Sequence, residues 1–323
     1  MQIVIVSPAL ADANNGNWRT AQRWTRFLAP LGRVRVTTHW PDSEAAGDDV
    51  MLALHARRSA AAIRAWHELH GDAGLGVVLT GTDLHHDIHV SQEAIDSLHR
   101  AQALVVLHAR GIAGLPAALR SKARVILQSA NRRRPLGKTE HHLNVVVAGH
   151  LRSEKSPETI FATARLLQDM AGIRLIHIGK ALDPELADQA TATMQACPGY
   201  RWRGALPHDA VRDAIQRAHV LVHPSRMEGG ANVVIEAITS GTPVLASAVD
   251  GNIGLLGEDY PGYFPWGDAP SLAAMLTRLR LELTTGNALL RQLTPAIAAR
   301  APLFEPEHER QCVRQLVTDL HRR

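Results

Sequence analysis

The 323-residue sequence has few cysteines, no long apolar run and no strongly basic tail. Its two cysteines, Cys197 and Cys312, lack the CxxC spacing of a zinc or redox site, which favours a reducing compartment. No segment approaches the roughly 18 apolar residues that a membrane span needs, and the N-terminus MQIVIVSP has no basic leader region. These absences predict a cytoplasmic protein without a membrane partner.

The charge pattern is equally unspecialised. The formal net charge is only +4, and the densest basic cluster, Arg132–Arg134, stands before Pro135 in a stretch typical of a solvated linker. This balance suits small anionic ligands better than a nucleic acid. The loop after the first apolar run also lacks a GxGxxG fingerprint and a P-loop lysine, which argues against a dinucleotide-dependent oxidoreductase or an NTPase.

Short β-rich runs alternate with helical stretches along the chain, a pattern that predicts parallel sheets. In the first half the predicted strands are Ile3–Val6, Val34–Thr37, Val50–Leu54, Gly76–Leu79, Ala103–Leu107 and Val125–Leu127. The predicted helices between them are Trp18–Leu31, Ala60–His70, Gln92–Arg100 and Ile112–Leu119. A polar, proline-bearing stretch then ends this series, so we place a first domain at residues 1–136.

A second series of the same kind follows. Its predicted strands are Leu143–Ala148, Ile173–Ile178, Val220–Val222 and Val244–Leu245, and its helices are Pro157–Met170, Pro184–Cys197, His208–Arg217, Asn232–Ser240, Ser271–Thr284 and Glu307–His321. We place the second domain at 137–304 and expect the helix in 305–323 to pack back toward the first. The fold class predicted is α/β, with two Rossmann-like, doubly wound parallel-sheet domains facing an interdomain cleft.

The most specific local pattern is HPSRMEGGANVVIEAITSGTPVLAS, residues 223–247. It follows a strand, passes through Gly229 and Gly230, and enters a helix whose free N–H groups carry about half a positive charge. This order predicts a site for a diphosphate. Glu228 and Glu236 flank the helix start, and a carboxylate can accept hydrogen bonds from two adjacent sugar hydroxyls. The structural alternative is a Ser225–Glu228 capping box with Glu236 as a solvated helix residue.

This segment resembles the E-x7-E motif of retaining GT-B glycosyltransferases. The resemblance implies that Glu228 contacts the donor hexose, that Glu236 contacts the nucleotide ribose, and that the amides of Gly229, Gly230, Ala231 and Asn232 meet the phosphates. The loop AGHLRSEKSPE resembles a second family element, in which Lys155 matches the family lysine and His150 stands where an arginine is usual. Lys155, with Arg152 or His150, would stabilise the departing diphosphate. Arg203 is a weaker candidate for the wall of the base site.

In the first half, polar loops follow three predicted strands. Residues 14–17 lead into a helix whose start we expect to face the cleft, with acceptor contacts from Asn15, Gly16, Asn17 and Arg19. Arg57, Arg58 and Ser59 at a helix start form a plausible oxyanion cradle, although solvated arginines in a first helical turn are an equal alternative. His55, just before them, is a further candidate for binding the acceptor. Thr82 and Asp83 begin the third loop. Its run His85, His86, Asp87 and His89 has no assignable outlying ligand, so we expect no metal and no other cofactor.

Several motifs together resemble the selenosugar synthase branch of this family, which is associated with selenoneine biosynthesis. They include NGNWRTAQRW, ALHARRS, LTGTDLHHDI, HLRSEK, EGGANVVIEA and DGNIGLLGEDYPGYFPWGD. The resemblance implies an enzyme that joins a UDP-sugar, typically UDP-N-acetylglucosamine, to selenophosphate, giving a 1-seleno-sugar, UDP and phosphate. It also implies a functional link to other enzymes of that pathway. The pair His85-His86 departs from the pattern expected there.

Three alternatives remain open at the level of sequence. The chain can be a retaining glycosyltransferase that uses a UDP-sugar and a hydroxyl acceptor, a UDP-sugar epimerase that needs no acceptor, or a sugar-nucleotide binding protein without turnover. An acceptor screen separates the first from selenosugar synthesis. Conversion of the UDP-sugar alone indicates the second, and a ligand-induced rise in melting temperature without any product indicates the third.

Overall fold

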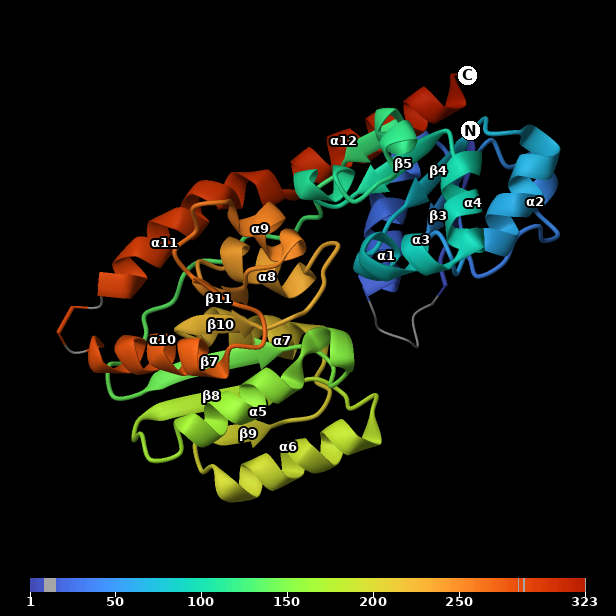
Figure 1. Ribbon diagram of the computed structural model, residues 1–323. Helices are drawn as coiled ribbons and strands as arrows, with labels where there is room; N and C mark the ends of the chain where they lie inside the picture. The colour runs from blue at the N-terminus through green and yellow to red at the C-terminus, as the bar shows by residue number, and fades with distance from the viewer. Residues whose placement is uncertain (9–15, 284, 287, 323) are drawn as a thin grey trace. The chain divides into compact units, whose positions relative to one another are not determined.

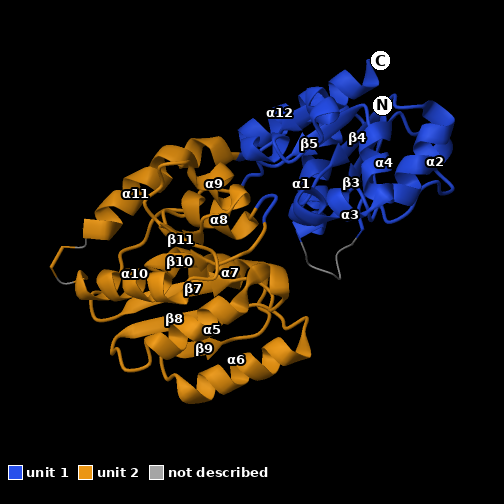
Figure 2. Ribbon diagram, in the orientation of Figure 1, with its two compact units in different colours: residues 1–129, 228–230, 306–323 blue, residues 130–227, 231–305 orange. Residues whose placement is uncertain are grey.

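The computed structural model describes residues 1–8, 16–283, 285–286 and 288–322, which form two compact units (Figures 1 and 2). The first unit comprises Met1–Ser129, Glu228–Gly230 and Pro306–Arg323, and the second comprises Ala130–Met227 and Ala231–Glu305. The chain changes units after Ser129, whereas the sequence placed the boundary after residue 136. The reason is local hydrogen bonding. The Ala130 N–H donates to the Phe304 carbonyl (3.1 Å) and the Arg133 N–H to the Thr239 carbonyl (2.9 Å), so this stretch is held by the second unit.

The first unit is built on six parallel strands in the order β2-β1-β3-β4-β5-β6. The strands are β1 Gln2–Val6, β2 Arg33–Thr37, β3 Val50–Leu54, β4 Leu75–Val78, β5 Ala103–Val106 and β6 Ala123–Val125. The helices are α1 Gly16–Leu28, α2 Ala60–His70, α3 Ile88–Val90, α4 Gln92–Arg100 and α12 Pro306–His321. Alternation along β1 divides the core between the two faces of the sheet. Ile3 and Ile5 belong to the cluster of Trp24, whereas Val4 and Val6 belong to the cluster of Trp66.

The C-terminal helix α12 packs on α1 through a buried carboxylate. Glu309 is 1% exposed and forms an ion pair with Arg23 (2.7 Å). It also accepts hydrogen bonds from the Trp24 indole (2.7 Å) and the Ser129 backbone N–H (2.8 Å). A buried carboxylate is tolerated when donors satisfy it in this way. Glu309 therefore fixes the end of the chain to the first unit.

The second unit repeats the plan with the strand order β12-β11-β10-β7-β8-β9, again all parallel. Its strands are β7 Leu143–Ala148, β8 Ile173–Ile178, β9 Tyr200–Trp202, β10 Val220–His223, β11 Val244–Ser247 and β12 Tyr263–Phe264. Its helices are α5 Pro157–Leu166, α6 Pro184–Ala196, α7 His208–Arg217, α8 Asn232–Thr239, α9 Asp250–Leu256, α10 Ala269–Leu281 and α11 Ala288–Arg300. Two doubly wound units with parallel sheets confirm the predicted α/β class with two Rossmann-like domains.

Some predicted elements differ in the structure. The helix predicted at Ile112–Leu119 is replaced by two 3-10 turns, Ala109–Ile112 and Ala117–Lys122, because Pro116 interrupts the backbone hydrogen bonding between them. Helix α11 was not predicted, since it carries Pro295 in its interior. Within the described ranges, no helix combines the length and the apolar character needed to cross a bilayer.

Candidate functional site

The strand order of the second sheet places both donor motifs at one point. From β7 the chain winds outward through β8 and β9 on one side, and then returns to β10, β11 and β12 on the other side. The loops that leave β7 and β10 therefore diverge at the carboxyl ends of neighbouring strands. This topological switch point is where open α/β sheets bind ligands. The loop of Lys155 follows β7, and the segment of Glu228 follows β10.

The glutamate predicted to bind ribose is buried. Glu236 lies within α8 and is 6% exposed, so the alternative of a solvated helix residue is wrong. Its Oε1 atom lies 2.6 Å from Nε2 of His208, the first residue of α7. The sequence did not indicate His208, because 28 residues separate the two side chains and no motif spacing joins them.

The alternative of a Ser225–Glu228 capping box is wrong, because the helix after β10 begins only at Asn232. The Ser225 hydroxyl lies 3.2 Å from Nε2 of His223, and the Ser225 carbonyl accepts from the Ser247 hydroxyl (2.6 Å). Helix α8 begins after Ala231, which provides no side-chain cap. The first backbone N–H groups of α8, beginning with that of Asn232, therefore have no acceptor on the side chain of Ala231. A helix start that binds phosphate requires N–H groups left open in this way.

The two glycines after Glu228 pack closely within the first unit, to which Glu228–Gly230 is assigned by its contacts. A Cβ on Gly229 would lie 2.4 Å from the Gly81 nitrogen, and one on Gly230 would lie 3.0 Å from Leu107. The imidazole Nε2 of His85 lies 3.2 Å from the Glu228 carbonyl oxygen. Gly229 is required for the close approach of two backbones, and Gly230 leaves room for the Leu107 side chain, roles that the sequence did not distinguish from ligand binding. The Glu228 side chain is itself buried, at 7% exposure.

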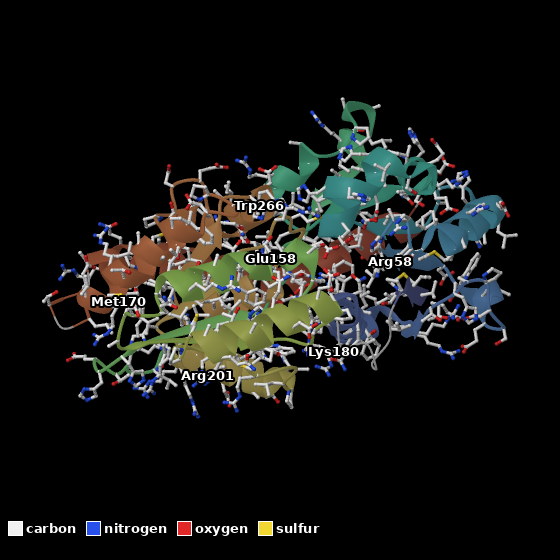
Figure 3. The ribbon with its side chains drawn as sticks, turned by 60° about the horizontal axis from the view of Figure 1, so that its bottom comes forward. Arg58, Glu158, Met170, Lys180, Arg201 and Trp266 are labelled. Atoms are coloured by element: carbon white, nitrogen blue, oxygen red, sulfur yellow. The ribbon has the colours of Figure 1, made fainter. Side chains whose placement is uncertain are left out.

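The loop after β7 gathers positive charge around one histidine. His150 accepts a hydrogen bond at Nδ1 from the Lys180 backbone N–H (3.1 Å; Lys180 is labelled in Figure 3). Burial lowers the pKa of His150, and the charges of Arg152, Lys155 and Lys180 lower it further. The ring is therefore neutral near pH 7 and carries its proton on Nε2, which can donate to an anion.

The backbone ties this loop to the donor segment. The Arg226 N–H donates to the Glu154 carbonyl (2.9 Å), which joins the loop after β7 to the loop after β10. Lys155 ends the 3-10 turn Ser153–Lys155, and the following Ser156 adopts a left-handed conformation (φ 47°). The indole of Trp266, a half-exposed residue, donates to the Ser156 hydroxyl (2.9 Å; Figure 3). Trp266 thus supports the turn, and the sequence offered no signal for this contact.

Arg203 lies farther from the switch point. It follows β9, the edge strand two positions from β7, and its backbone N–H donates to the His177 carbonyl (2.9 Å). Its side chain is exposed. His177 is instead fully buried, with Nδ1 lying 3.1 Å from the Tyr200 hydroxyl, and it hydrogen bonds with the backbone at Gly149. This core histidine therefore supports the start of the His150 loop.

In the first sheet, the switch point lies between β1 and β3. Of the residues predicted after β1, Asn15 lies outside the described residues, Gly16 and Asn17 begin α1, and Arg19 is half-buried within it. The loop after β3 starts at His55, whose φ of 76° is unusual for a residue with a side chain. The neighbouring loop after β4 contains Thr82 and Asp83, so most of the described predicted acceptor residues meet at the same edge of the sheet.

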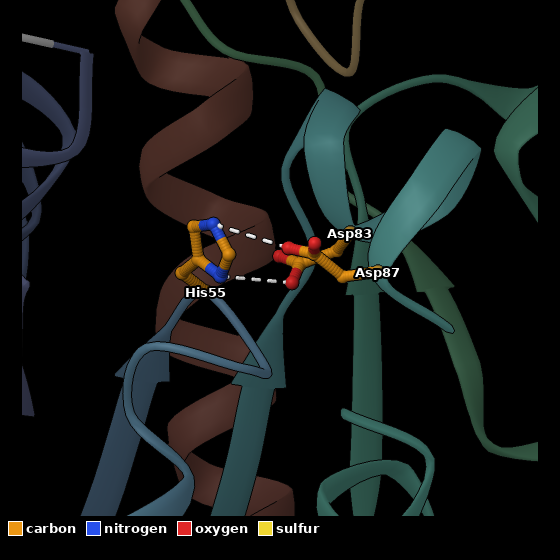
Figure 4. Close-up of side chains that lie close together, drawn as sticks. All are labelled: His55, Asp83 and Asp87. Carbon is orange, nitrogen blue, oxygen red and sulfur yellow. Dashed lines mark ion pairs between the residues drawn. The ribbon is translucent and has the colours of Figure 1, made fainter. Parts of the chain in front are cut away.

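A buried charge cluster connects these loops (Figure 4). His55 Nδ1 lies 2.9 Å from Asp83 Oδ1, and His55 Nε2 lies 3.7 Å from Asp87 Oδ2 and 3.2 Å from the Thr82 hydroxyl. The Thr80 N–H donates to Asp83 (2.9 Å), and the Arg57 guanidinium pairs with Asp87 (3.1 Å). Asp83 has no exposed surface. It therefore anchors the loop, and its predicted contact with an acceptor stays a prediction.

The same three residues are the described group that can hold a metal ion. Ligand atoms of His55, Asp83 and Asp87 all lie within 4.8 Å of one another. Most of these atoms already have partners, since Asp83 accepts from a backbone N–H and contacts the imidazole while Oδ1 of Asp87 pairs with a guanidinium; among the described residues Oδ2 of Asp87 has no hydrogen-bond partner. A divalent cation would have to displace the existing partners and would then lie beside the positive charge of Arg57. This donor set fits a cluster held by its own contacts better than a resident metal.

The two arginines of this loop differ in their surroundings. The side chain of Arg57 is 46% exposed and is held by Asp87. Arg58, labelled in Figure 3, is exposed, and its backbone N–H lies 3.4 Å from His55 Nδ1. Both remain accessible for an anion, and Arg57 is the one whose orientation is fixed.

Two doubly wound units, each with polar loops at its switch point, define an α/β protein of the GT-B glycosyltransferase fold. Residues 142–281, which lie in the second unit except for Glu228–Gly230, match the family model described as Glycosyl transferases group 1. This agrees with the family resemblance of the E-x7-E segment.

Relatives and solved structures agree with this class. The chain is 28% identical over 179 residues to D-inositol 3-phosphate glycosyltransferase of Streptomyces avermitilis, covering 52% of this chain and 38% of that protein. It is 25% identical over 196 residues to the phosphatidylinositol N-acetylglucosaminyltransferase gpi3 subunit of Schizosaccharomyces pombe, covering 57% and 40%. Sucrose-phosphate synthase from Thermosynechococcus elongatus shares the fold, with a TM-score of 0.78 at 18% identity over 99% of both chains. Anabaena HepE in complex with UDP and glucose gives 0.74 at 15% identity over 99% and 100%.

Proposed function

We propose that this protein transfers a sugar from a UDP-sugar, with UDP-N-acetylglucosamine as the first choice, to selenophosphate. The observation that carries the donor half is the arrangement at the second switch point. There a buried Glu236, an uncapped α8 and the cationic loop of Lys155 follow adjacent strands. The S. pombe relative is named an N-acetylglucosaminyltransferase and the HepE structure contains UDP, which supports this choice of donor.

Each element of the donor site has a chemical task in this proposal. The vicinal hydroxyls of the ribose donate to the carboxylate of Glu236, and the hexose is bound through Glu228. The N–H groups at the start of α8 meet the diphosphate. Lys155, Arg152 and the Nε2–H of His150 neutralise the charge that UDP gains as it departs, which is the largest contribution that fixed donors make to such a reaction.

The acceptor half rests on the motifs of the first unit and on its two arginines. The anionic selenophosphate binds Arg57 and Arg58, and its selenium attacks the anomeric carbon. The carbon–selenium bond forms as the bond between the anomeric carbon and the UDP oxygen breaks, and UDP takes the electron pair. Water then cleaves the selenium–phosphorus bond to release phosphate and the 1-seleno-sugar. Selenium is a strong nucleophile, so this step needs no general base. The family resemblance implies retention at the anomeric carbon.

The proposal includes no resident metal, because the cations of the Lys155 loop serve the leaving group and most ligand atoms of the His55 cluster already have protein partners. Turnover should be the same with and without EDTA, and added Mg²⁺ or Mn²⁺ should not increase it. A loss of activity that a divalent cation reverses would refute this part.

A second candidate is transfer to a hydroxyl of a phosphate-bearing acceptor. The curated relatives named D-inositol 3-phosphate glycosyltransferases favour it, although the matched segments span only 34–40% of their length. An anion cradle made of Arg57 and Arg58 suits either acceptor. The nucleophile, selenium or oxygen, is what separates the two reactions.

The deciding experiment is mass spectrometry after incubation of the protein with UDP-N-acetylglucosamine and selenophosphate. A new sugar with the isotope pattern of selenium, formed together with UDP and phosphate, is the expected result. Parallel reactions contain inositol phosphate in place of selenophosphate, or no acceptor. Product only with the hydroxyl acceptor would favour the second candidate, whereas conversion of the donor alone would indicate an epimerase.

A further inference from the structure

His208 lies beside the glutamate predicted to bind the nucleotide ribose. It is the first residue of α7, and its Nε2 atom lies 2.6 Å from Oε1 of Glu236 in α8 (both helices are labelled in Figure 1). The side chain of Glu236 is 8% exposed and that of His208 is 35% exposed. Both residues belong to the second unit. The pair therefore sits at the rim of the proposed donor site, with the carboxylate on the buried side.

The contact leaves most of the carboxylate available to a ligand. A carboxylate has about four positions at which it accepts hydrogen bonds, and His208 occupies one of them on Oε1. A free glutamate side chain samples several rotamers, and ordering it when a ligand binds reduces affinity. Holding Oε1 from α7 fixes the plane of the carboxylate before the ligand arrives. The remaining positions then face two adjacent hydroxyls in a defined geometry.

A second group on α7 acts on Glu236 through its charge. Arg212, one turn beyond His208, is buried and donates to the Asn131 carbonyl (2.8 Å). Burial lowers the pKa of Arg212, and the negative charge of Glu236 counteracts this. Arg212 is thus committed to another partner, whereas His208 holds the carboxylate directly.

We propose that His208 is a positioning residue for nucleotide binding, which orients Glu236 so that its carboxylate accepts hydrogen bonds from both hydroxyls of the ribose. This inference rests on the proposed function, which places the ribose on Glu236. It adds a residue that no motif of the sequence indicates. It also predicts that the loss of His208 weakens the recognition of the ribose hydroxyls specifically, rather than nucleotide binding in general.

The test is calorimetric titration of the full chain with UDP and with 2′,3′-dideoxy-UDP. The wild-type protein is expected to bind UDP more tightly. His208→Ala should weaken UDP by about threefold to tenfold and leave the dideoxy nucleotide nearly unchanged, since only the first uses the oriented carboxylate. His208→Gln should recover most of the difference, because its amide N–H can donate to Glu236. With saturating UDP-sugar, kcat of His208→Ala should match wild type while the donor KM rises.

A matched control is Arg217→Ala, which removes an exposed cation from the far end of the same helix and should change neither affinity. Equal weakening of both nucleotides in His208→Ala would mean that the residue only stabilises the fold, and would overturn the inference, as would unchanged UDP affinity. The proposed function fails in a different way. If wild type binds the two nucleotides equally and Glu236→Ala has no effect, the ribose is not on Glu236, and both proposals fall.

Discussion

The two switch points share a topology but differ in the charged side chains that their loops carry. After β3 and β4, the buried carboxylates of Asp83 and Asp87 are paired with His55 and the guanidinium of Arg57. After β7, the charges that act on His150 are all positive. In the first arrangement the carboxylates are held by groups of the same cluster, whereas in the second three cations act on His150, and one of them, Arg152, also lies 3.8 Å from Glu154. The same strand order thus supports a loop cluster whose polar groups bind one another in one unit and a loop rich in cations in the other.

The comparison also extends to the two buried histidines. His55 has carboxylates on both sides, and His177 has the hydroxyl of Tyr200 and the ring of Phe161 near it. Burial keeps His177 neutral, whereas His55 lies between two carboxylates. The two histidines therefore support their loops through different partners.

The largest effect is expected where the buried cluster is broken. Asp83→Ala leaves His55 without its closest carboxylate and removes the acceptor of the Thr80 N–H, so the free energy of unfolding should fall by about 3–5 kcal/mol. Urea denaturation followed by circular dichroism measures it. Asp96→Ala, which removes an exposed carboxylate on α4, is the control and should leave the midpoint unchanged. Equal stability of the two variants would mean that the contacts of Asp83 with His55 and the Thr80 N–H do not stabilise the first unit.

The second prediction concerns the donor site, with its cationic loop after β7. Lys155→Ala and Glu228→Ala should each lower turnover about 100-fold in a protein that melts like wild type, because each removes a fixed contact to the donor in the transition state. Steady-state rates at saturating substrates measure this. Glu158→Ala changes an exposed carboxylate in the first turn of α5 and serves as the control (Figure 3). Near wild-type rates for both site variants would remove the assignment of the donor site.

The third effect concerns His177 and pH. Burial lowers the pKa of His177 to about 4, whereas the unfolded chain titrates near 6.5. The unfolded state therefore binds the proton first, and the stability that depends on a neutral His177 is lost as the pH falls from 6.5 toward 4. Between pH 7 and pH 5 the loss should be about 2 kcal/mol. In His177→Gln this contribution is absent, so the wild-type curve should fall more steeply than that of the variant. Parallel curves would show that His177 is not held neutral.

Much of this arrangement was predictable because alternating strands and helices predict parallel sheets and the motifs fall just after strands; the strand order itself came from the structure. Helix α7 was predicted with its observed bounds, and β7 and β8 were too. Helix α9 and strand β12 were missed, since the first is short and carries two glycines and the second has only two residues. Contacts across the fold were not predictable. His208–Glu236 and Trp266–Ser156 join residues that are distant in sequence, and only packing brings them together.

The smallest effect is expected at the acceptor side, where the structure separates two neighbouring arginines. Arg57 is oriented by Asp87, so its guanidinium loses little freedom when an anion binds, whereas Arg58 is exposed. Arg57→Ala should raise the KM for the acceptor about tenfold, and Arg58→Ala by a smaller factor, with the donor KM nearly unchanged in both.

Initial rates over a grid of donor and acceptor concentrations separate the two constants. Asp87→Asn tests the role of the ion pair, because it removes the carboxylate that holds Arg57 and keeps the charge of Arg57. It should raise the KM for the acceptor, but by less than Arg57→Ala does. If either arginine variant instead raised the donor KM more than the acceptor KM, the loop after β3 would belong to nucleotide binding. The cluster of His55, Asp83 and Asp87 would then support binding of the nucleotide, and the assignment of the acceptor to the first unit would be wrong.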